Sequence, residues 1–205
     1  MHEDENGQPQ PQGSIFQQKD RLRRIQRNLA SKMSAEDRRK QSLGIRHSIL
    51  KHPCWKAARR VLAFIPMLDE PDIFPLFQTT LESGKTLCLP RFSETAGNYH
   101  PAAIKDLTQD LLPGRYGIQE PHPACQREDL SHMDLTLVPG LAFDRRGWRL
   151  GRGKGYYDQL LSTQVGIRCG IALNFQWVES VPNETLDQKM NWIITPGDSV
   201  KVVSR

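Results

Sequence analysis

Apolar residues near the start of this chain recur every three or four positions, which predicts two amphipathic helices. The second helix would begin at the capping sequence Ser34-x-x-Asp37 and end at His52-Pro53, because a residue that precedes proline disfavours the helical conformation. The residues expected on the buried faces of the two helices are Leu22, Ile25, Leu29, Leu43, His47 and Leu50. The basic residues of the first helix would then occupy its other faces.

Short apolar runs after the second helix predict buried strands at 61–65, 85–89, 134–138, 169–173 and 191–195. A helix through Phe77 and Leu81, ended by Gly84, separates the first two strands, and another helix precedes the fourth. This alternation predicts a mostly parallel sheet with right-handed crossovers. Prolines interrupt residues 91–130, where we expect loops and a hairpin.

Side chains that could bind a ligand follow several of these strands. Ligands of open parallel sheets gather at the carboxyl ends of the strands. Glu70, Arg91, Asp144 and Asp187 each come after a predicted strand, as does a glycine-rich loop at residues 147–155. We therefore expect these groups to converge in one cleft.

Length and composition favour one α/β domain with no covalent or metal staples. A chain of 205 residues can bury a sufficient apolar core by itself. The four cysteines form no close pair, which predicts free thiols, and no apolar run approaches the roughly 18 residues of a membrane span. Residues 1–13 lack a secretory or transit-peptide pattern. We expect a disordered tail at 1–13, an α/β domain at 14–205, and a cytoplasmic monomer.

The net charge of +5 is unevenly distributed along the chain. Residues 14–60 contain 14 Lys or Arg residues and only three acids. Such a basic helical segment can contact nucleic acid, bind a phosphorylated ligand, or serve solubility alone. Phe16 and Trp55 are the only aromatic residues in this segment, which weakens the nucleic-acid interpretation because many single-strand binders stack bases on aromatic rings.

Several common functional motifs are absent from the sequence. A Walker loop is excluded because five residues separate Gly147 from Gly153 and because Gly155 follows Lys154. The glycines run G-x-G-x-G, whereas dinucleotide-binding folds use G-x-G-x-x-G. Neither H-E-x-x-H nor G-x-S-x-G occurs. We therefore expect neither a protein-held zinc ion nor a serine nucleophile.

Residues 140–161 instead predict a polyphosphate site between a strand and a helix. Gly151, Gly153 and Gly155 lack Cβ atoms, so backbone N–H groups can close around phosphate oxygens where a helix begins. Arg152 and Lys154 alternate with these glycines and add positive charge. The simpler alternative is that the glycines only make a tight connection.

The same residues resemble the signature of the 5-formyltetrahydrofolate cyclo-ligases, also called methenyltetrahydrofolate synthetases. The matching positions are Pro139-Gly140, Ala142-Phe143-Asp144, Gly147, Arg149-Leu150-Gly151, Gly153 and Gly155-Tyr156-Tyr157-Asp158. Weaker matches are scattered between about Lys19 and Pro196. The resemblance implies a three-layer sandwich in which helices flank a mostly parallel sheet, similar to the folds of sugar-phosphate isomerases and CoA-transferases.

The resemblance implies an enzyme that uses ATP and Mg²⁺ to convert 5-formyltetrahydrofolate to 5,10-methenyltetrahydrofolate through a phosphorylated formyl intermediate, with release of ADP and phosphate. Two other functions remain open. The first is a catalytically weak, RNA-associated or regulatory module that uses the basic N-terminal segment. The second is a sugar-phosphate isomerase or CoA-transferase on a similar scaffold. The intact glycine-rich run at residues 149–158 favours the enzyme, with small-molecule substrates and no nucleic-acid partner.

The resemblance also implies roles for individual positions. The implied ATP contacts are Lys19, Arg23, Arg149, Leu150, Gly151, Arg152, Gly153, Lys154, Gly155, Tyr156 and Tyr157. The implied folate contacts are Ile65, Glu70, Tyr116, Arg152, Gly153, Lys154, Gly155 and Tyr156. Asp158 and Asp187 resemble the Mg²⁺ carboxylates, and Arg152 and Lys154 are the candidate catalytic cations.

Simpler alternatives exist for the three acids, namely a helix first-turn acid for Asp158 and solvated loop acids for Glu70 and Asp187. Tyr116 stands where relatives often have tryptophan, which keeps an aromatic face at that position. Residues 97–103 depart from the family pattern, and Tyr99 is the candidate there for packing against the ligand.

Overall fold

A seven-stranded sheet forms the centre of the computed structural model, which describes residues 13–114 and 117–202. The predicted tail lies outside the described residues except for Gly13. The sheet contains β1 (Arg60–Leu62), β2 (Thr86–Ser93), β3 (Asn98–Ile104), β6 (Leu135–Val138), β9 (Ile167–Ile171), β10 (Trp192–Thr195) and β11 (Asp198–Lys201). Their order is β11-β10-β9-β6-β1-β2-β3, and all five inner strands pair in parallel. The predicted mostly parallel sheet is confirmed.

The strand order reverses direction next to β1. From β1 the chain proceeds outward to β2 on one side, whereas β6, β9 and β10 follow in order on the other side. The connections therefore leave in opposite directions from β1 and β6, and open α/β sheets bind ligands at the carboxyl ends of strands at such a switch point. Residues 63–65 follow β1, and Pro139 and Gly140 follow β6, so these segments flank the expected crevice.

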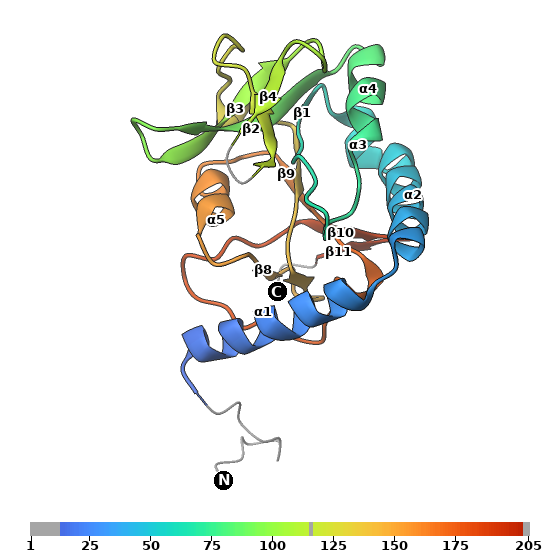
Figure 1. Cartoon of the computed structure of the whole chain (residues 1–205), viewed down its shortest axis with the longest axis vertical. Coiled ribbons are helices and arrows are strands. Elements are labelled where there is room, and N and C mark those ends of the chain that lie inside the picture. The colour runs from blue at the N-terminus through green and yellow to red at the C-terminus, as the bar shows by residue number, and fades with distance from the viewer. Residues whose placement is uncertain (1–12, 115–116, 203–205) are drawn as a thin grey trace.

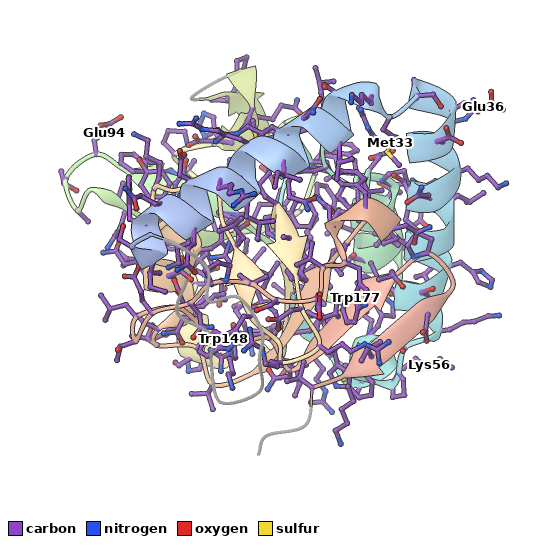
Figure 2. The ribbon with its side chains drawn as sticks, turned by 90° about the horizontal axis from the view of Figure 1, so that it is seen from below. Met33, Glu36, Lys56, Glu94, Trp148 and Trp177 are labelled. Atoms are coloured by element: carbon purple, nitrogen blue, oxygen red, sulfur yellow. The ribbon has the colours of Figure 1, made fainter. Side chains whose placement is uncertain are left out.

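Helices cover both faces of the sheet (Figure 1). The helices α2 (Ala35–Lys51), α3 (Pro53–Ala57) and α4 (Pro75–Glu82) lie on one face, and α5 (Tyr156–Leu161) lies on the other. The long helix α1 (Ile15–Lys32) runs across one end of the molecule, with Met33 at the turn into α2 (Figure 2). This is the expected three-layer sandwich. Among the described residues, no helix combines the length and apolar composition that crossing a bilayer requires.

Neighbouring residues of each inner strand enter different cores, because side chains alternate between the faces of a sheet. Val61 and Leu137 pack with the residues of α2, α3 and α4. Leu62 packs with Leu160 of α5, and Val138 packs with Leu161 of the same helix. Both faces of the sheet are thus apolar, which explains why the strands read as continuous apolar runs in the sequence.

The predicted inner face of α1 was wrong in part. Its buried residues are Gln26 and Ala30, whereas Ile25 and Leu29 are 46% and 41% exposed. The helix instead turns Lys19 and Arg23 toward the rest of the molecule, where they make the polar contacts described below. Apolar periodicity therefore misidentified part of this face, because the surface that α1 covers includes polar groups as well as the apolar cluster that Leu22 contacts.

The predicted inner face of α2 was also wrong. Ile45 and Ile49 are fully buried against the sheet, whereas Leu43 is 61% exposed and His47 and Leu50 also face solvent. The two sets of residues have similar helical periodicity, so spacing alone could not select between them. The β-branched pair at i and i+4 fits the core under α2.

Two smaller antiparallel strand pairs and the edge strand β11 of the main sheet complete the fold. A hairpin in the proline-rich region joins β4 (Leu111–Pro113) to β5 (Gln119–Pro121), as the sequence suggested. The strands β7 (Ala142–Phe143) and β8 (Arg149–Leu150) pair antiparallel and deliver the glycine-rich loop to the start of α5. The edge strand β11, which the sequence did not predict, pairs antiparallel with β10.

Candidate active site

A cavity of about 560 Å³ lies at the carboxyl ends of β1 and β6, where the topology predicts a ligand crevice. Its wall includes almost every candidate site residue, namely Lys19, Arg23, Ile65, Glu70, Arg149, Leu150, Gly151, Arg152, Gly153, Lys154, Gly155, Tyr156, Tyr157, Asp158 and Asp187. Tyr116 lies outside the described residues. Segments from four distant parts of the chain therefore meet around one space.

The glycine-rich loop forms one side of the cavity. Gly153 has φ +107° and Gly155, the residue that caps α5, has φ +69°, so a side chain at either position would strain the backbone. Lys154 lies between them, is exposed, and has no ion pair with any acid of the described chain. The loop can therefore bind an anionic ligand through its backbone N–H groups and the ammonium group of Lys154.

Arg152 extends from the same loop to two acids that follow β1. Its Nη2 lies 2.6 Å from Asp69 Oδ1 and 3.0 Å from Glu70 Oε1, and its Nε lies 3.2 Å from the same Glu70 oxygen. Glu70 is 6% exposed, and its Oε2 accepts a hydrogen bond from the Met67 N–H at 3.0 Å. Burial raises the pKa of Glu70 above its ordinary value, and the charge of Arg152 offsets part of that rise.

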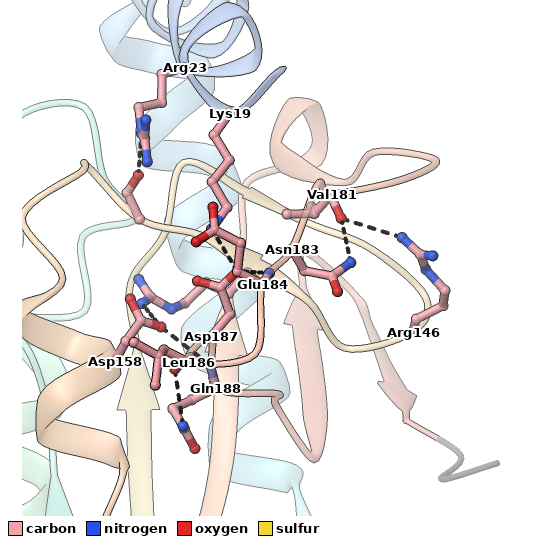
Figure 3. A network of polar contacts seen from close by, with 12 residues as sticks. Lys19, Arg23, Arg146, Asp158, Val181, Asn183, Glu184, Leu186, Asp187 and Gln188 are labelled. Carbon is pink, nitrogen blue, oxygen red and sulfur yellow. Dashed lines mark hydrogen bonds and ion pairs between the residues drawn. The ribbon is translucent and has the colours of Figure 1, made fainter. Parts of the chain in front are cut away.

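Arg149 holds Asp158 in place beneath the loop. Arg149 is 5% exposed, and its Nη2 lies 2.9 Å from Asp158 Oδ1. The same oxygen accepts the Gln188 N–H at 3.3 Å (Figure 3). The Arg149 guanidinium also lies over the Tyr157 ring, 5.6 Å from its centroid, a cation–π geometry. Asp158 is thus joined to both the loop and the segment that carries Asp187.

The helix α1 reaches the cavity through two cations (Figure 3). Lys19 Nζ lies 2.7 Å from Asp187 Oδ2 and 3.4 Å from Glu184 Oε1. Arg23 Nε donates to the Gly151 carbonyl oxygen at 3.1 Å. These contacts explain why the polar face of α1 turns inward.

Asp158 and Asp187 fit a hard cation such as Mg²⁺ only with help from other ligands. Each carboxylate has one oxygen, Asp158 Oδ2 or Asp187 Oδ1, that accepts no hydrogen bond within the described chain. No group of three or more His, Cys, Asp or Glu residues in that same part of the chain could hold a metal ion alone. Mg²⁺ commonly combines one or two carboxylates with phosphate oxygens and waters. The pair therefore suits a metal that arrives with phosphate.

An aromatic cluster forms another side of the cavity. Tyr99 lies 5.2 Å from Tyr156 and 5.1 Å from Phe92, measured between ring centroids, in edge-to-face contacts. Tyr99 lines the cavity, as expected of the residue that packs against a ligand. Phe92 was not predicted, although its place is set by register, because Phe92 of β2 pairs directly with Tyr99 of β3.

Two residues that were expected in the cleft lie elsewhere. Arg91 donates through Nη1 to the Pro123 carbonyl oxygen at 2.8 Å and is not part of the cavity wall. The Asp144 side chain is fully buried and accepts hydrogen bonds from the N–H groups of Trp148 and Val181. Asp144 follows β7, whereas Arg91 lies within β2, which extends beyond the predicted strand end. Both side chains hold loops together instead of facing the ligand space.

The sequence also missed several wall residues. Phe64, Met67, Pro90 and Ile118 add apolar surface to the cavity. Asp69, the partner of Arg152, was not among the predicted site residues. Phe64 could have been found from its position, since it lies two residues after β1 at the switch point.

Comparison with known proteins gives consistent matches. A model of the 5-formyltetrahydrofolate cyclo-ligase family matches residues 15–196. A probable 5-formyltetrahydrofolate cyclo-ligase from Caenorhabditis elegans is 27% identical over 91% of this chain and 97% of its own length. The 5-formyltetrahydrofolate cyclo-ligase of Mycolicibacterium smegmatis is 32% identical over 68% of this chain and 75% of its own length.

Solved structures match as well. The 5,10-methenyltetrahydrofolate synthetase of Aquifex aeolicus superposes with a TM-score of 0.82 at 30% identity, covering 91% of this chain and 94% of that one. The 5,10-methenyltetrahydrofolate synthetase of Mycoplasma pneumoniae has a TM-score of 0.69 at 18% identity, over 87% of this chain and 98% of that one, which shows a shared fold.

Proposed function

The chain belongs to the 5-formyltetrahydrofolate cyclo-ligase family, and we propose that it uses ATP to convert 5-formyltetrahydrofolate to 5,10-methenyltetrahydrofolate, with release of ADP and phosphate. The observation that supports this most directly is the composition of the cavity wall. A cationic glycine-rich loop adjoins a buried carboxylate and an aromatic side in one space at the switch point of the sheet. One side suits a polyphosphate, and the other suits a flat ring that carries hydrogen-bond donors.

The reaction requires alignment of two substrates and no covalent bond to the protein. The formyl oxygen is a poor leaving group, so it first attacks the γ-phosphorus of ATP and expels ADP. The neighbouring anilino nitrogen then attacks the formyl carbon, forms the new C–N bond, loses its proton and expels phosphate. Positioning two substrates can supply a large part of such a rate enhancement.

The cations of the loop and α1 suit the transferring phosphoryl group. Arg152 and Lys154 stand at the loop, and Lys19 and Arg23 approach from α1. Neutralising the charge that builds on phosphoryl oxygens stabilises the transition state. Arg152 also contacts Glu70, so it links the phosphate side of the cavity to the folate side.

Glu70 suits the pterin ring of the folate. An ionised carboxylate can accept paired hydrogen bonds from a 2-amino-pterin edge. Ile65, Tyr99 and Tyr156 would pack against the ring system. Tyr116, outside the described residues, stays a proposed folate contact on the family resemblance alone.

Asp158 and Asp187 would hold Mg²⁺ through Asp158 Oδ2 and Asp187 Oδ1, which accept no hydrogen bond from the residues that the structure describes. The metal, when bound, would neutralise charge on the phosphate oxygens of ATP. The two carboxylates are also linked through the backbone, because the N–H of Gln188, the residue after Asp187, donates a hydrogen bond to Asp158.

The proposed reaction has a direct test. Purified protein with 5-formyltetrahydrofolate and Mg-ATP is expected to accumulate the methenyl chromophore and to release one ADP for each product molecule. Omission of folate, ATP or Mg²⁺ should abolish product. A folded protein that binds ATP but makes no chromophore would contradict the proposal, and salt-sensitive RNA binding without chromophore would favour the RNA-associated alternative.

The rate should also depend on the protonation of Glu70. The kcat/KM for folate is expected to fall as pH drops through the raised pKa of Glu70, at a pH above the ordinary glutamate value of about 4.3. Above that pKa the ionised carboxylate accepts hydrogen bonds from the pterin, and below it the protonated acid loses one acceptor. Glu70→Gln should lower the plateau by about 10–100-fold and remove this acid limb.

The control for Glu70→Gln is Glu179→Gln, because Glu179 is an exposed acid outside the cavity wall. This variant should keep both the wild-type plateau and the acid limb in kcat/KM. An identical acid limb in Glu70→Gln and wild-type protein would show that another group titrates there.

We propose that the protein works as a cytoplasmic monomer on small molecules and has no nucleic-acid partner. Its four cysteines are all free thiols, which suits a reducing compartment. Sedimentation analysis at assay concentrations tests the monomer, and a dimer would contradict it.

A further inference from the structure

Both carboxylates proposed for Mg²⁺ are already neutralised by protein cations. Lys19 Nζ lies 2.7 Å from Asp187 Oδ2 (Figure 3). Arg149 Nη2 lies 2.9 Å from Asp158 Oδ1. The side chains of Lys19 and Asp187 are only 12% and 16% exposed, so solvent and salt screen this pair less than a surface pair. A metal ion that approaches Asp187 therefore meets an ammonium group at short range.

The net charge of the cavity wall also disfavours binding of a metal ion without nucleotide. In the part of the chain that the structure describes, five Lys or Arg side chains and four Asp or Glu side chains line the cavity. A divalent cation alone enters a space of net positive formal charge, whereas a polyphosphate enters a space of complementary charge. Nucleotide binding is therefore favoured before metal binding.

We propose that Lys19 is a counter-ion that holds Asp187 until the nucleotide arrives, so that the site binds Mg²⁺ only together with the polyphosphate. This inference rests on the proposed function, because the phosphate oxygens of ATP are the groups that draw the ammonium away. Lys19 Nζ exchanges Asp187 Oδ2 for a phosphate oxygen, and the carboxylate becomes available to the metal. The flexible four-carbon stem of lysine permits this movement, and no covalent bond changes.

The surrounding contacts allow Lys19 to move while Asp187 and α1 stay in place. Asp187 Oδ2 also accepts the Glu184 N–H at 2.7 Å, which holds the carboxylate after Lys19 leaves. Arg23 anchors α1 one turn further along through its 3.1 Å bond to the Gly151 carbonyl oxygen. The exchange therefore needs a side-chain movement and no displacement of the helix.

The test measures Mn²⁺ binding to the full chain by electron paramagnetic resonance, without nucleotide or folate. Lys19→Met is expected to bind Mn²⁺ about tenfold more tightly than wild-type protein, because the competing cation is gone. The same variant should bind a non-hydrolysable ATP analogue more weakly in the presence of a chelator, because a phosphate partner is gone. The proposed exchange predicts these two opposite changes.

Matched variants separate this effect from damage to the fold. Lys19→Gln should repeat the result of Lys19→Met, and Lys19→Arg, which keeps the charge, should bind Mn²⁺ as weakly as wild-type protein. Arg21→Met removes an exposed cation from the same helix and should change neither affinity. Circular dichroism of each variant verifies that α1 and the rest of the fold are intact.

An unchanged or weaker Mn²⁺ affinity in folded Lys19→Met and Lys19→Gln would overturn the inference. That result would leave the proposed function standing if wild-type protein still forms the methenyl chromophore. A wild-type protein that forms no chromophore would instead contradict the proposed function, and the nucleotide-free Mn²⁺ measurement does not depend on that assay.

Discussion

Arg152→Ala is expected to lower kcat/KM for 5-formyltetrahydrofolate by about 10²–10³-fold, the size of effect seen when one preorganised donor to a developing charge is removed. Arg152 contacts Glu70 and Asp69 at 2.6–3.2 Å and lines the same cavity as the glycine-rich loop. Its loss removes a cation from the phosphate side and releases the carboxylate of Glu70 on the folate side. Steady-state formation of the methenyl chromophore measures the effect.

Two further variants make this prediction specific. Arg152→Lys keeps the charge without the planar fork that bonds both acids, so it should recover only part of the lost rate. Arg145→Ala removes an exposed cation outside the cavity wall and should keep the wild-type rate. Wild-type kinetics in Arg152→Ala would exclude this residue from the chemistry.

Asp144→Ala is expected to lower the free energy of unfolding by about 1–3 kcal/mol for each buried donor that it leaves unpaired. The Asp144 side chain is fully buried, and Oδ2 lies 2.8 Å from Arg146 Nη2. Its two oxygens also accept the N–H groups of Trp148 at 3.1 Å and Val181 at 2.9 Å. Alanine would leave these donors unpaired, and buried unpaired donors are costly. Urea denaturation measures the change.

Unlike Arg152→Ala, Asp144→Ala should affect stability and not catalysis. Folded Asp144→Ala should keep most of its turnover per molecule at low temperature, because Asp144 is not part of the cavity wall. Glu179→Ala, a change of an exposed acid two residues before Val181, should alter stability by less than about 0.5 kcal/mol. Unchanged stability in Asp144→Ala would refute the structural role.

The sequence alone determined the local elements and the central layer of this protein. The apolar runs predicted the five inner strands, with ends displaced by one to three residues in most cases. The glycines at 151, 153 and 155 predicted a loop at the start of a helix, and the structure has α5 beginning at Tyr156. These features were readable because neighbouring residues decide them, through strand alternation and the permissive backbone of glycine.

The tertiary structure decided which faces and which acids serve the site. Ile25 and Leu29 have helical spacing, yet α1 turns Lys19 and Arg23 inward because the surface it covers presents Asp187 and the Gly151 carbonyl oxygen. Asp144 and Asp187 both follow strands, but the carboxylate oxygens of Asp144 accept hydrogen bonds from the N–H groups of its own loop and of Val181 and do not face the ligand. Periodicity and position identify candidates, whereas burial and hydrogen bonding depend on partners that lie tens of residues away in the sequence, as Lys19 and Asp187 do.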